Sequence, residues 1–373
     1  MPDPCVLRMA RTLVRYSAEV KKGDVVRVFG GGEAAPLILE IFRECIGCGA
    51  HPYVQVGVPG LDEILLKEGS KSQLRFVQPV AMFEVKKVDV LISILSEVNT
   101  KRLTGTDPAR QALAQQARKP LMNLFMKRSA LHERGGPGGL RWTLTLWPTQ
   151  AYAQDAEMSL EEYSDFVFRA CFAHKADPIA EWKKLSALQK KVIRYLKGRK
   201  KVRISGPDTD LELGISGRRF INCEGRRNFP DGEVFTGPQE RSVKGRVRFS
   251  FPACYGGREV DGVRLSFEKG EVVAMEAEKN EGYLHQMLGM DAGAKRVGEF
   301  AFATNWGIRR FTKNILFDEK IGGTVHLALG KGYPESGSKN DSALHWDMIC
   351  DLRQGGEAYV DGKLFQKNGT LMI

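Results

Sequence analysis

The residues best suited to metal chemistry lie in the C-terminal half of this sequence, inside segments whose other residues are mostly apolar. His326 lies in TVHLALG, and His345 and Asp347 lie in ALHWDMICDL. Because alternate residues of a strand point to the same face, His345 and Asp347 are expected to share one. An unpaired carboxylate is very costly to bury. The neighbouring imidazole therefore favours a divalent metal ion, with a structural hydrogen-bonded His–Asp pair as the alternative.

Two glutamates occur where a sheet normally carries hydrophobic residues. Glu233 follows an Asp-Gly turn in NFPDGEVFTGP, and Glu299 begins the apolar run of RVGEFAFATN. With the two histidines and Asp347, these glutamates would supply mixed nitrogen and oxygen ligands for one or two ions. Such a donor set suits zinc, cobalt or manganese.

Other motifs of the sequence carry weaker signals. Gly30-x-Gly32-x-x-Ala35 matches the glycine pattern of a dinucleotide-binding turn, but PYVQVGV offers no acidic residue for the ribose. Cys45-x-x-Cys48 has no second cysteine pair that would complete a zinc site. The sequence has no G-x-S-x-G, H-E-x-x-H or complete P-loop motif. We therefore expect a tight turn at the glycines and structural thiols at the cysteines.

The N-terminal half has the pattern of an α/β domain. Residues 24–29 and 52–58 are typical of strands, and a glycine turn and an amphipathic helix connect them as in a βαβ unit. Residues 88–96 are almost continuously apolar, as in a parallel strand that is buried on both faces. Helices are expected at 5–20, 108–118, 159–172 and 178–200, and residues 120–125 are a candidate strand.

From residue 202 onward, short alternating runs broken by glycines replace the helical patterns. VRISG, TDLELGI, GRVRFSF and TVHLALG are typical of short strands, and a short helix is expected near residues 280–290. The predicted fold is therefore an α/β N-terminal domain with a largely parallel sheet, plus a β-rich α+β C-terminal metal-binding domain. We place the domains at residues 1–200 and 201–373.

The overall charge raises the question of an anionic partner. The 373 residues include 56 Lys plus Arg and 45 Asp plus Glu, for a formal net charge of +11. The basic helix expected at 178–200 also has a regular apolar stripe and lacks interleaved aromatic residues, so its lysines are expected to form a solvated face. We expect no nucleic-acid partner and no membrane partner.

The cellular compartment is predicted from two further features. No window approaches the roughly 18 apolar residues of a membrane span. Seven scattered cysteines are not a disulfide framework. Both features favour a cytoplasmic protein with reduced thiols.

The segments around the candidate ligands resemble the thermophilic-type metalloaminopeptidases, the group of aminopeptidase T, aminopeptidase S and PepS. The matching stretches are NFPDGEVFTGP, GEFAFATN, NILFDEKIGGTVHLALGKGYP and SALHWDMICDL, and they occur in the family's order. In the N-terminal half, RTLVRYSAEVKKGDVVRV and WPTQAYAQDAEMSLEEYSDFVF match in style. The resemblance covers nearly the whole chain. Its one departure is FAFATN after Glu299, where a more glycine-rich G-(I/L)-G-T-N is expected.

This resemblance implies a site, a substrate class and an assembly. The implied ligands of a two-metal site form what we call the five-residue set: Glu233, Glu299, His326, His345 and Asp347. Tyr333, seven residues after His326, matches the family's active-site tyrosine. Such enzymes are homodimers that remove N-terminal amino acids from peptides with a free N-terminus. Zinc is the expected metal, with cobalt, manganese or magnesium as alternatives.

The expected reaction is hydrolysis by a water or hydroxide held on the two ions. Glu299 is expected to bridge the ions and to act in catalysis, and Tyr333 is expected to donate to the tetrahedral oxyanion. The proton shuttle stays open between Glu299, Tyr333 and Glu319. The alternative function is a mononuclear non-haem iron ring-cleaving dioxygenase, which needs only two histidines and one carboxylate. The two additional acids, Glu233 and Glu299, favour the two-metal peptidase.

Overall fold

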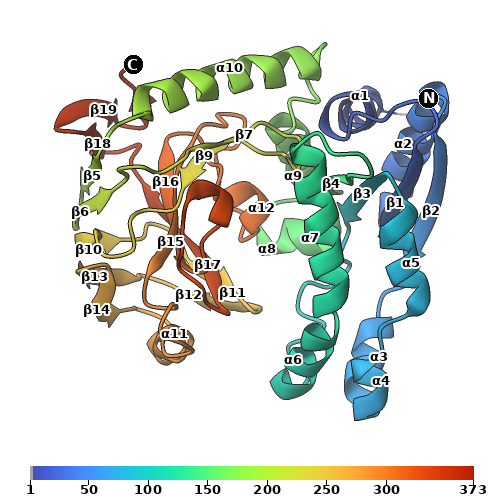
Figure 1. Ribbon diagram of the computed structural model, residues 1–373, viewed down its shortest axis with the longest axis horizontal. Coiled ribbons are helices and arrows are strands. Elements are labelled where there is room, and N and C mark those ends of the chain that lie inside the picture. The colour runs from blue at the N-terminus through green and yellow to red at the C-terminus, as the bar shows by residue number, and fades with distance from the viewer. Residues whose placement is uncertain (1–2) are drawn as a thin grey trace. The chain divides into compact units, whose positions relative to one another are not determined.

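The computed structural model describes residues 3–373, which form two compact units (Figure 1). The first unit extends to Ile179 and also contains Arg226–Phe229, and the second contains Ala180–Gly225 and Pro230–Ile373. Helix α10 (Pro178–Leu196) lies almost wholly in the second unit and contributes Val192 and Leu196 to the core of that unit. Within the described residues, no helix has the length and apolar character needed to cross a membrane.

The first unit is built on a five-stranded parallel sheet, as the sequence predicts. The strand order is β2-β1-β3-β4-β8, and every neighbouring pair is parallel. Central strand β3 is mostly buried, as its apolar sequence predicts for a strand covered on both faces. The strands are β1 (Val25–Gly31), β2 (His51–Gly57), β3 (Val90–Leu95), β4 (Arg141–Leu146) and β8 (Asn228–Phe229).

Helices connect the strands of the first unit. They are α1 (Pro4–Thr12), which continues as a π-helix (Leu13–Ser17), a 3-10 turn (Gly32–Ala34), α2 (Ala35–Gly47), α3 (Leu61–Glu68), α4 (Lys71–Arg75), α5 (Pro79–Lys87), α6 (Pro108–Ala117), α7 (Lys119–Glu133), α8 (Gln150–Asp155) and α9 (Leu160–Ala170). Residues 120–125 lie inside α7, so the candidate strand at this position is wrong. An apolar run of this length does not by itself distinguish a strand from a helix.

The glycine turn after β1 has a packing explanation. The Gly31 N–H donates to Ser96 Oγ at 2.7 Å, and a Cβ on Gly31 would lie only 2.8 Å from that oxygen. A side chain at Gly31 would therefore force Ser96 to move, whereas a Cβ on Gly32 would meet nothing within 4 Å. Cys45 is buried, and burial raises the pKa of its thiol to about 12, as expected for a structural thiol.

The second unit is rich in antiparallel strands, as the sequence predicts. One sheet has eight strands in the order β14-β13-β10-β6-β5-β18-β19-β20, and another has five in the order β17-β16-β15-β9-β7. The eight-stranded sheet comprises β5 (Lys201–Gly206), β6 (Thr209–Gly214), β10 (Lys244–Arg248), β13 (Arg264–Glu268), β14 (Glu271–Glu276), β18 (Glu357–Val360), β19 (Lys363–Lys367) and β20 (Thr370–Leu371). The five-stranded sheet comprises β7 (Ile221–Cys223), β9 (Glu233–Thr236), β15 (Val297–Ala303), β16 (Thr324–Gly330) and β17 (His345–Asp351).

Smaller elements complete the second unit. They are a hairpin of β11 (Ala253–Tyr255) and β12 (Arg258–Val260), helices α11 (Glu281–Leu288) and α12 (Ile315–Asp318), and a 3-10 turn (Pro334–Ser336). Helix α11 confirms the short helix predicted near residues 280–290. Every residue of β15 and β16 is buried, although each strand carries an ionisable side chain. This contradiction between burial and charge marks the candidate site.

Candidate metal centre

Strand register brings the five-residue set to one face of the five-stranded sheet. Glu299 on β15 is opposite Ala328 on β16, and Ala328 is opposite Asp347 on β17. His326 is two residues before Ala328, and His345 is two residues before Asp347, so both histidines point to the same face as these partners. Four members of the set therefore come from three adjacent strands.

Glu233 joins this face from the neighbouring strand β9. It is opposite Ala303, which lies four residues after Glu299 on β15 and therefore on the same face. Ala301 and Ala303 occupy the ligand face, while Phe300 and Phe302 pack into the hydrophobic core. The departure from a glycine-rich sequence after Glu299 thus adds only methyl groups beside the candidate ligands.

Both imidazole rings direct Nε2 toward carboxylate oxygens. His326 Nε2 lies 3.3 Å from Glu299 Oε1, 3.5 Å from Glu233 Oε2 and 3.9 Å from Asp347 Oδ1. His345 Nε2 lies 3.5 Å from Asp347 Oδ1 and 3.9 Å from Glu299 Oε2. Ligand atoms around a tetrahedral ion with bonds of ~2.1 Å lie roughly 3.4 Å apart. The separations therefore fit atoms that share a metal ion.

The second nitrogen of each ring has a backbone acceptor. His326 Nδ1 lies 3.0 Å from the Glu319 carbonyl oxygen, and His345 Nδ1 lies 2.8 Å from the Lys331 carbonyl oxygen. A proton on each Nδ1 satisfies these carbonyls and leaves the Nε2 lone pair facing the carboxylates. Metal-bound histidines are oriented in the same way.

The carboxylates of this face lack enough hydrogen-bond donors. Glu233 and Glu299 are 5% and 4% exposed, and Glu233 Oε2 and Asp347 Oδ1 have no hydrogen-bond partner among residues 3–373. Burial, the Glu319 charge and the Glu299 charge raise the pKa of Glu233 well above its usual value. A buried acceptor without a donor is costly, and a cation would satisfy it.

The charge state of His326 depends on the same acids. Burial alone would lower the pKa of His326, but the hydrogen bond to Glu299 and the charges of Glu233, Glu299 and Asp347 raise it to about 10. Without a metal, this ring therefore holds a proton that partly compensates the acids. A divalent ion would replace the proton and provide a stronger positive charge.

Tyr333 lies at the edge of the site. Its ring packs edge-to-face against His345, with centroids 5.3 Å apart, and lies tilted against Phe235, with centroids 5.5 Å apart. Burial of the hydroxyl and the charges of Glu299 and Asp347 raise the pKa of Tyr333 above its usual value. The phenol therefore keeps its proton at neutral pH and can act as a hydrogen-bond donor.

The structure adds two charged residues that the sequence analysis missed. Lys320 is fully buried and forms an ion pair with Glu319, and Asp231 is 3% exposed two residues before Glu233. Burial raises the pKa of Asp231 to about 6, while Lys320 and the N–H groups of Gly232 and Gly225 oppose this shift. Lys320 follows Glu319 directly in DEKIGG, and only its burial distinguishes it from a surface lysine.

Three groups of residues place potential ligand atoms within 4.8 Å of one another. These groups are Glu233 with Glu299 and His326, Glu319 with His326 and Asp347, and Cys223 with Asp231 and Glu233. The first two groups share His326 and overlap the five-residue set. The donor chemistry thus fits a divalent metal ion.

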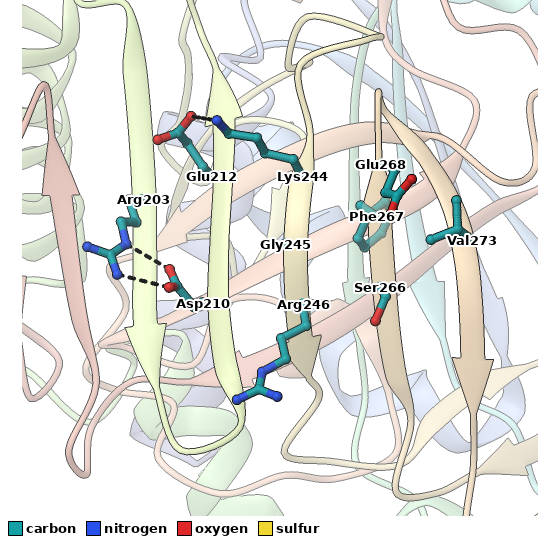
Figure 2. Close-up of a pocket in the computed structure, with 10 residues that line it drawn as sticks. All are labelled: Arg203, Asp210, Glu212, Lys244, Gly245, Arg246, Ser266, Phe267, Glu268 and Val273. Carbon is teal, nitrogen blue, oxygen red and sulfur yellow. Dashed lines mark hydrogen bonds and ion pairs between the residues drawn. The ribbon is translucent and has the colours of Figure 1, made fainter.

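A surface groove of about 700 Å³ lies apart from the five-residue set, across strands of the eight-stranded sheet (Figure 2). Two of its three acids are paired: Arg203 donates to both oxygens of Asp210, at 2.7 and 2.9 Å, and Lys244 Nζ lies 3.1 Å from Glu212. The hydrogen bonds from Arg203 lower the pKa of Asp210. Paired charges at a sheet surface are typical of a solvated face rather than a catalytic site.

The buried acids and histidines define a candidate metal centre, and comparisons with known proteins identify the family. The sequence profile of the thermophilic metalloprotease (M29) family matches residues 3–370, and the chain therefore belongs to that family. The predicted resemblance is thus confirmed. The chain is a metalloaminopeptidase by family, and a metalloprotease requires divalent metal ions.

Individual relatives agree with this assignment. The chain is 29% identical to aminopeptidase 2 of Geobacillus stearothermophilus over 95% of this chain and 94% of that protein. It is 30% identical to aminopeptidase T of Thermus thermophilus over 72% of this chain and 71% of that protein. The structure of wild-type AmpT from Thermus thermophilus shares the fold, with a TM-score of 0.85, 23% identity and 99% of both chains covered. The dioxygenase alternative is not supported by these comparisons.

Proposed function

We propose that this metalloaminopeptidase hydrolyses the N-terminal residue of peptides with a water or hydroxide held on two divalent ions. The proposed ligands are the five-residue set. The observation that carries this proposal is that both Nε2 atoms face buried carboxylates, two of which have an oxygen without any donor in the described chain. A cation is the simplest partner for all of these atoms.

Glu299 is the proposed bridging ligand. Its Oε1 faces His326 Nε2 at 3.3 Å, whereas its Oε2 faces His345 Nε2 at 3.9 Å. Because its two oxygens face different histidines, the Glu299 carboxylate is suited to bind one ion through each oxygen. Its substitution should therefore affect both ions.

The charges of the site favour two ions of charge +2. The five-residue set contributes three negative charges against four positive charges, which leaves one positive charge for a hydroxide. Zinc is the proposed metal because the set mixes imidazole and carboxylate donors, and cobalt, manganese or magnesium are alternatives. When bound, the ions would polarise the scissile carbonyl and lower the pKa of a coordinated water toward 7.

Tyr333 is the proposed donor to the oxyanion. Its proton is retained because burial and the neighbouring acids raise its pKa. Its ring is held by His345 and Phe235, which would limit the loss of side-chain freedom on substrate binding. The proton shuttle is proposed among Glu299, Tyr333 and Glu319.

Metal analysis tests the site. Purified protein reconstituted with zinc and then dialysed should contain close to two ions per chain, and Glu233→Gln should lose at least one. Glu268→Gln on the eight-stranded sheet is the matched control and should keep both. A single redox-active iron in the purified protein would contradict the two-metal site and would favour a dioxygenase function.

Substrate capping tests the exopeptidase activity. A leucyl-anilide or a short peptide with a free N-terminus should be cleaved, and N-acetylation of the same compound should block cleavage. Equal cleavage of acetylated and free peptides would show that the enzyme is not an aminopeptidase.

The assembly and the roles of the two regions are further parts of the proposal. We propose a cytoplasmic homodimer in which residues 201–373 form the catalytic metal-binding domain and residues 1–200 form a scaffold. The first unit exposes apolar side chains that a second copy would cover: Val56 and Val58, which are 56% and 61% exposed, and Phe76, Val80 and Phe83, which are 61%, 70% and 61% exposed. Sedimentation analysis should give about twice the chain mass, and Val80→Glu should weaken the dimer.

A further inference from the structure

We propose that Ser336 is a positioning residue that holds the Tyr333 phenol in place for donation to the oxyanion. This inference rests on the proposed aminopeptidase function and deepens it by naming a residue that acts through Tyr333. Ser336 lies three residues after Tyr333, in the 3-10 turn Pro334–Ser336, and is not a member of the five-residue set.

The Ser336 hydroxyl links the backbone of Tyr333 to the end of strand β9. Its Oγ donates to the Tyr333 carbonyl oxygen at 2.6 Å and accepts from the Gly237 N–H at 3.0 Å. Gly237 directly follows β9, which ends at Thr236. Ser336 is 0% exposed, and a buried group that loses its partner is costly because solvent does not replace the lost bond.

Two backbone hydrogen bonds hold Ser336 itself in place. Its N–H donates to the Tyr333 carbonyl oxygen at 3.0 Å, and its own carbonyl oxygen accepts from the Arg219 N–H at 3.1 Å. The Arg219 carbonyl oxygen in turn accepts from the buried Thr236 hydroxyl at 2.9 Å. The position of Ser336 is therefore set by β9 and by the segment before β7.

The ring of Tyr333 is placed by the same strand. It contacts Phe235 on β9, with centroids 5.5 Å apart. Phe235 lies two residues after Glu233, so both side chains point to the ligand face of the sheet. Ser336 thus anchors the backbone of Tyr333 to the strand that its ring already contacts and that carries a candidate ligand.

Loss of the Ser336 hydroxyl would loosen Tyr333 without removing its phenol. Tyr333 is 39% exposed, so packing does not hold its side chain on every side and the anchor of its backbone matters more. A catalytic group displaced by about 1 Å can cost about 100-fold in rate. Removal of one oxyanion donor costs roughly 100- to 1000-fold in kcat. A serine that only supports the fold would instead lower stability and leave the phenol in place.

The first test is a double-mutant cycle on zinc-loaded protein. Ser336→Ala should lower kcat for a leucyl-anilide by about 10- to 100-fold with little change in KM, because the oxyanion forms only in the transition state. In a Tyr333→Phe background, the same substitution should lower kcat by less than about 3-fold, because no phenol is left to position. Equally large losses in both backgrounds, or an unchanged kcat in Ser336→Ala alone, would overturn the inference.

Ser338→Ala is the matched control in the same loop. Ser338 is also buried, at 6% exposed, but its Oγ accepts a long hydrogen bond, 3.4 Å from the Asn340 N–H, in place of a link to Tyr333. This variant should keep the wild-type kcat, and an equal loss in both serine variants would overturn the specific role of Ser336. Circular dichroism should verify that each variant is folded. If Ser336→Ala does not fold, Ser336→Cys takes its place in the cycle with the same expected pattern.

A second measurement needs no turnover. Protein with 3-fluorotyrosine at position 333 should give one narrow fluorine resonance, which Ser336→Ala should broaden or split and Ser338→Ala should leave unchanged. An unchanged resonance in Ser336→Ala would overturn the positioning role. Failure of wild-type protein to cleave leucyl-anilides would contradict the proposed function, and the fluorine spectrum would still report whether Ser336 holds Tyr333.

Discussion

Glu84 in the first unit and Glu233 in the second are both largely buried carboxylates, but their surroundings are opposite. Glu84 accepts from Arg27 Nη1 at 2.6 Å, Tyr53 Oη at 2.7 Å and Gln55 Nε2 at 2.6 Å. Glu233 has an oxygen without any donor in residues 3–373 and shares its surroundings with Glu299. A carboxylate with enough donors needs no further partner, whereas the unpaired oxygen of Glu233 would be satisfied by a bound cation.

The same contrast extends to the sheets. The first unit places its charged side chains in pairs such as Arg141 with Asp24, 2.7 Å apart, and Arg102 with Asp62, also 2.7 Å apart. The second unit places acids and histidines on strands that are otherwise wholly buried. These charged side chains of the first unit are thus paired with each other. The second unit has carboxylate oxygens without a donor in the described chain at one face of one sheet.

The largest expected effect is on catalysis. Glu299→Gln should reduce hydrolysis of a leucyl-anilide by at least ~1000-fold, because the variant loses the carboxylate that faces both histidines. Glu84→Gln, which changes the same type of residue in the first unit, should keep wild-type turnover at 25 °C. Steady-state kinetics on folded proteins measures both, and equal losses in the two variants would break the comparison.

Metal removal should affect the two units differently. Zinc at about 100 times its dissociation constant should slow amide exchange in β15, β16 and β17 by about 100-fold relative to chelator-treated protein. Strands β1 to β4 should show little change, because their charges are already paired. Hydrogen exchange followed by mass spectrometry measures both regions in one experiment. Equal protection of both would show that the ions do not act through this sheet.

The stability of the protein should depend on pH through Asp318, a buried acid of the second unit that accepts hydrogen bonds from Thr312. Thr312 donates to Asp318 through its N–H at 2.7 Å and its hydroxyl at 2.9 Å, yet burial still raises the pKa of Asp318 to about 8. The unfolded chain releases this proton near pH 4, whereas the folded protein holds it to about pH 8. The contribution of Asp318 to stability is therefore full below about pH 4 and is lost as the pH rises toward 8.

Asp318→Asn provides the measurement. Between pH 5 and pH 7, the free energy of unfolding of metal-free wild-type protein should fall by about 2–3 kcal/mol more than that of the variant. Urea unfolding at both pH values would test this difference. Parallel pH curves would show that Asp318 titrates normally in the folded protein.

The smallest effect should be on the stability of the first unit. Glu84→Gln should lower its free energy of unfolding by about 1–2 kcal/mol, because Arg27 loses its charged acceptor. Glu63→Gln is the control, since its pair with Lys67 is exposed and should contribute less than about 0.5 kcal/mol. If both variants behave alike, the Glu84 contacts are no more important than a surface ion pair.

Local sequence patterns predicted the types of most elements. The parallel sheet of the first unit followed from apolar strands separated by helices, and α11 followed from a short helical run. The candidate strand at 120–125 was wrong because PLMNLF is too short for its period to be distinguished, and its neighbours in α7 continue the helix. Residues 180–196 pack with the second unit because the apolar side of α10 completes that core, which no local pattern specifies.

The candidate metal ligands could be predicted from the sequence, but the other buried charged residues of the site could not. Acids and histidines inside apolar strands are visible in the sequence because burial of an unpaired charge is so costly. Lys320 and Asp231 were missed because a lysine after a glutamate and an aspartate in a turn are ordinary surface features. Their burial depends on α12 and on the segment before β9, which only long-range packing brings beside the ligands.

The sequence by itself determined the classes of the two regions, the five candidate ligands and the family. Only the tertiary structure decided that these ligands share one face, that each Nδ1 meets a backbone carbonyl, and that Lys320 holds Glu319 at the edge of the site. The physical reason is that helix and strand patterns are set by near neighbours, whereas register between β9, β15, β16 and β17 depends on pairing residues far apart in the chain.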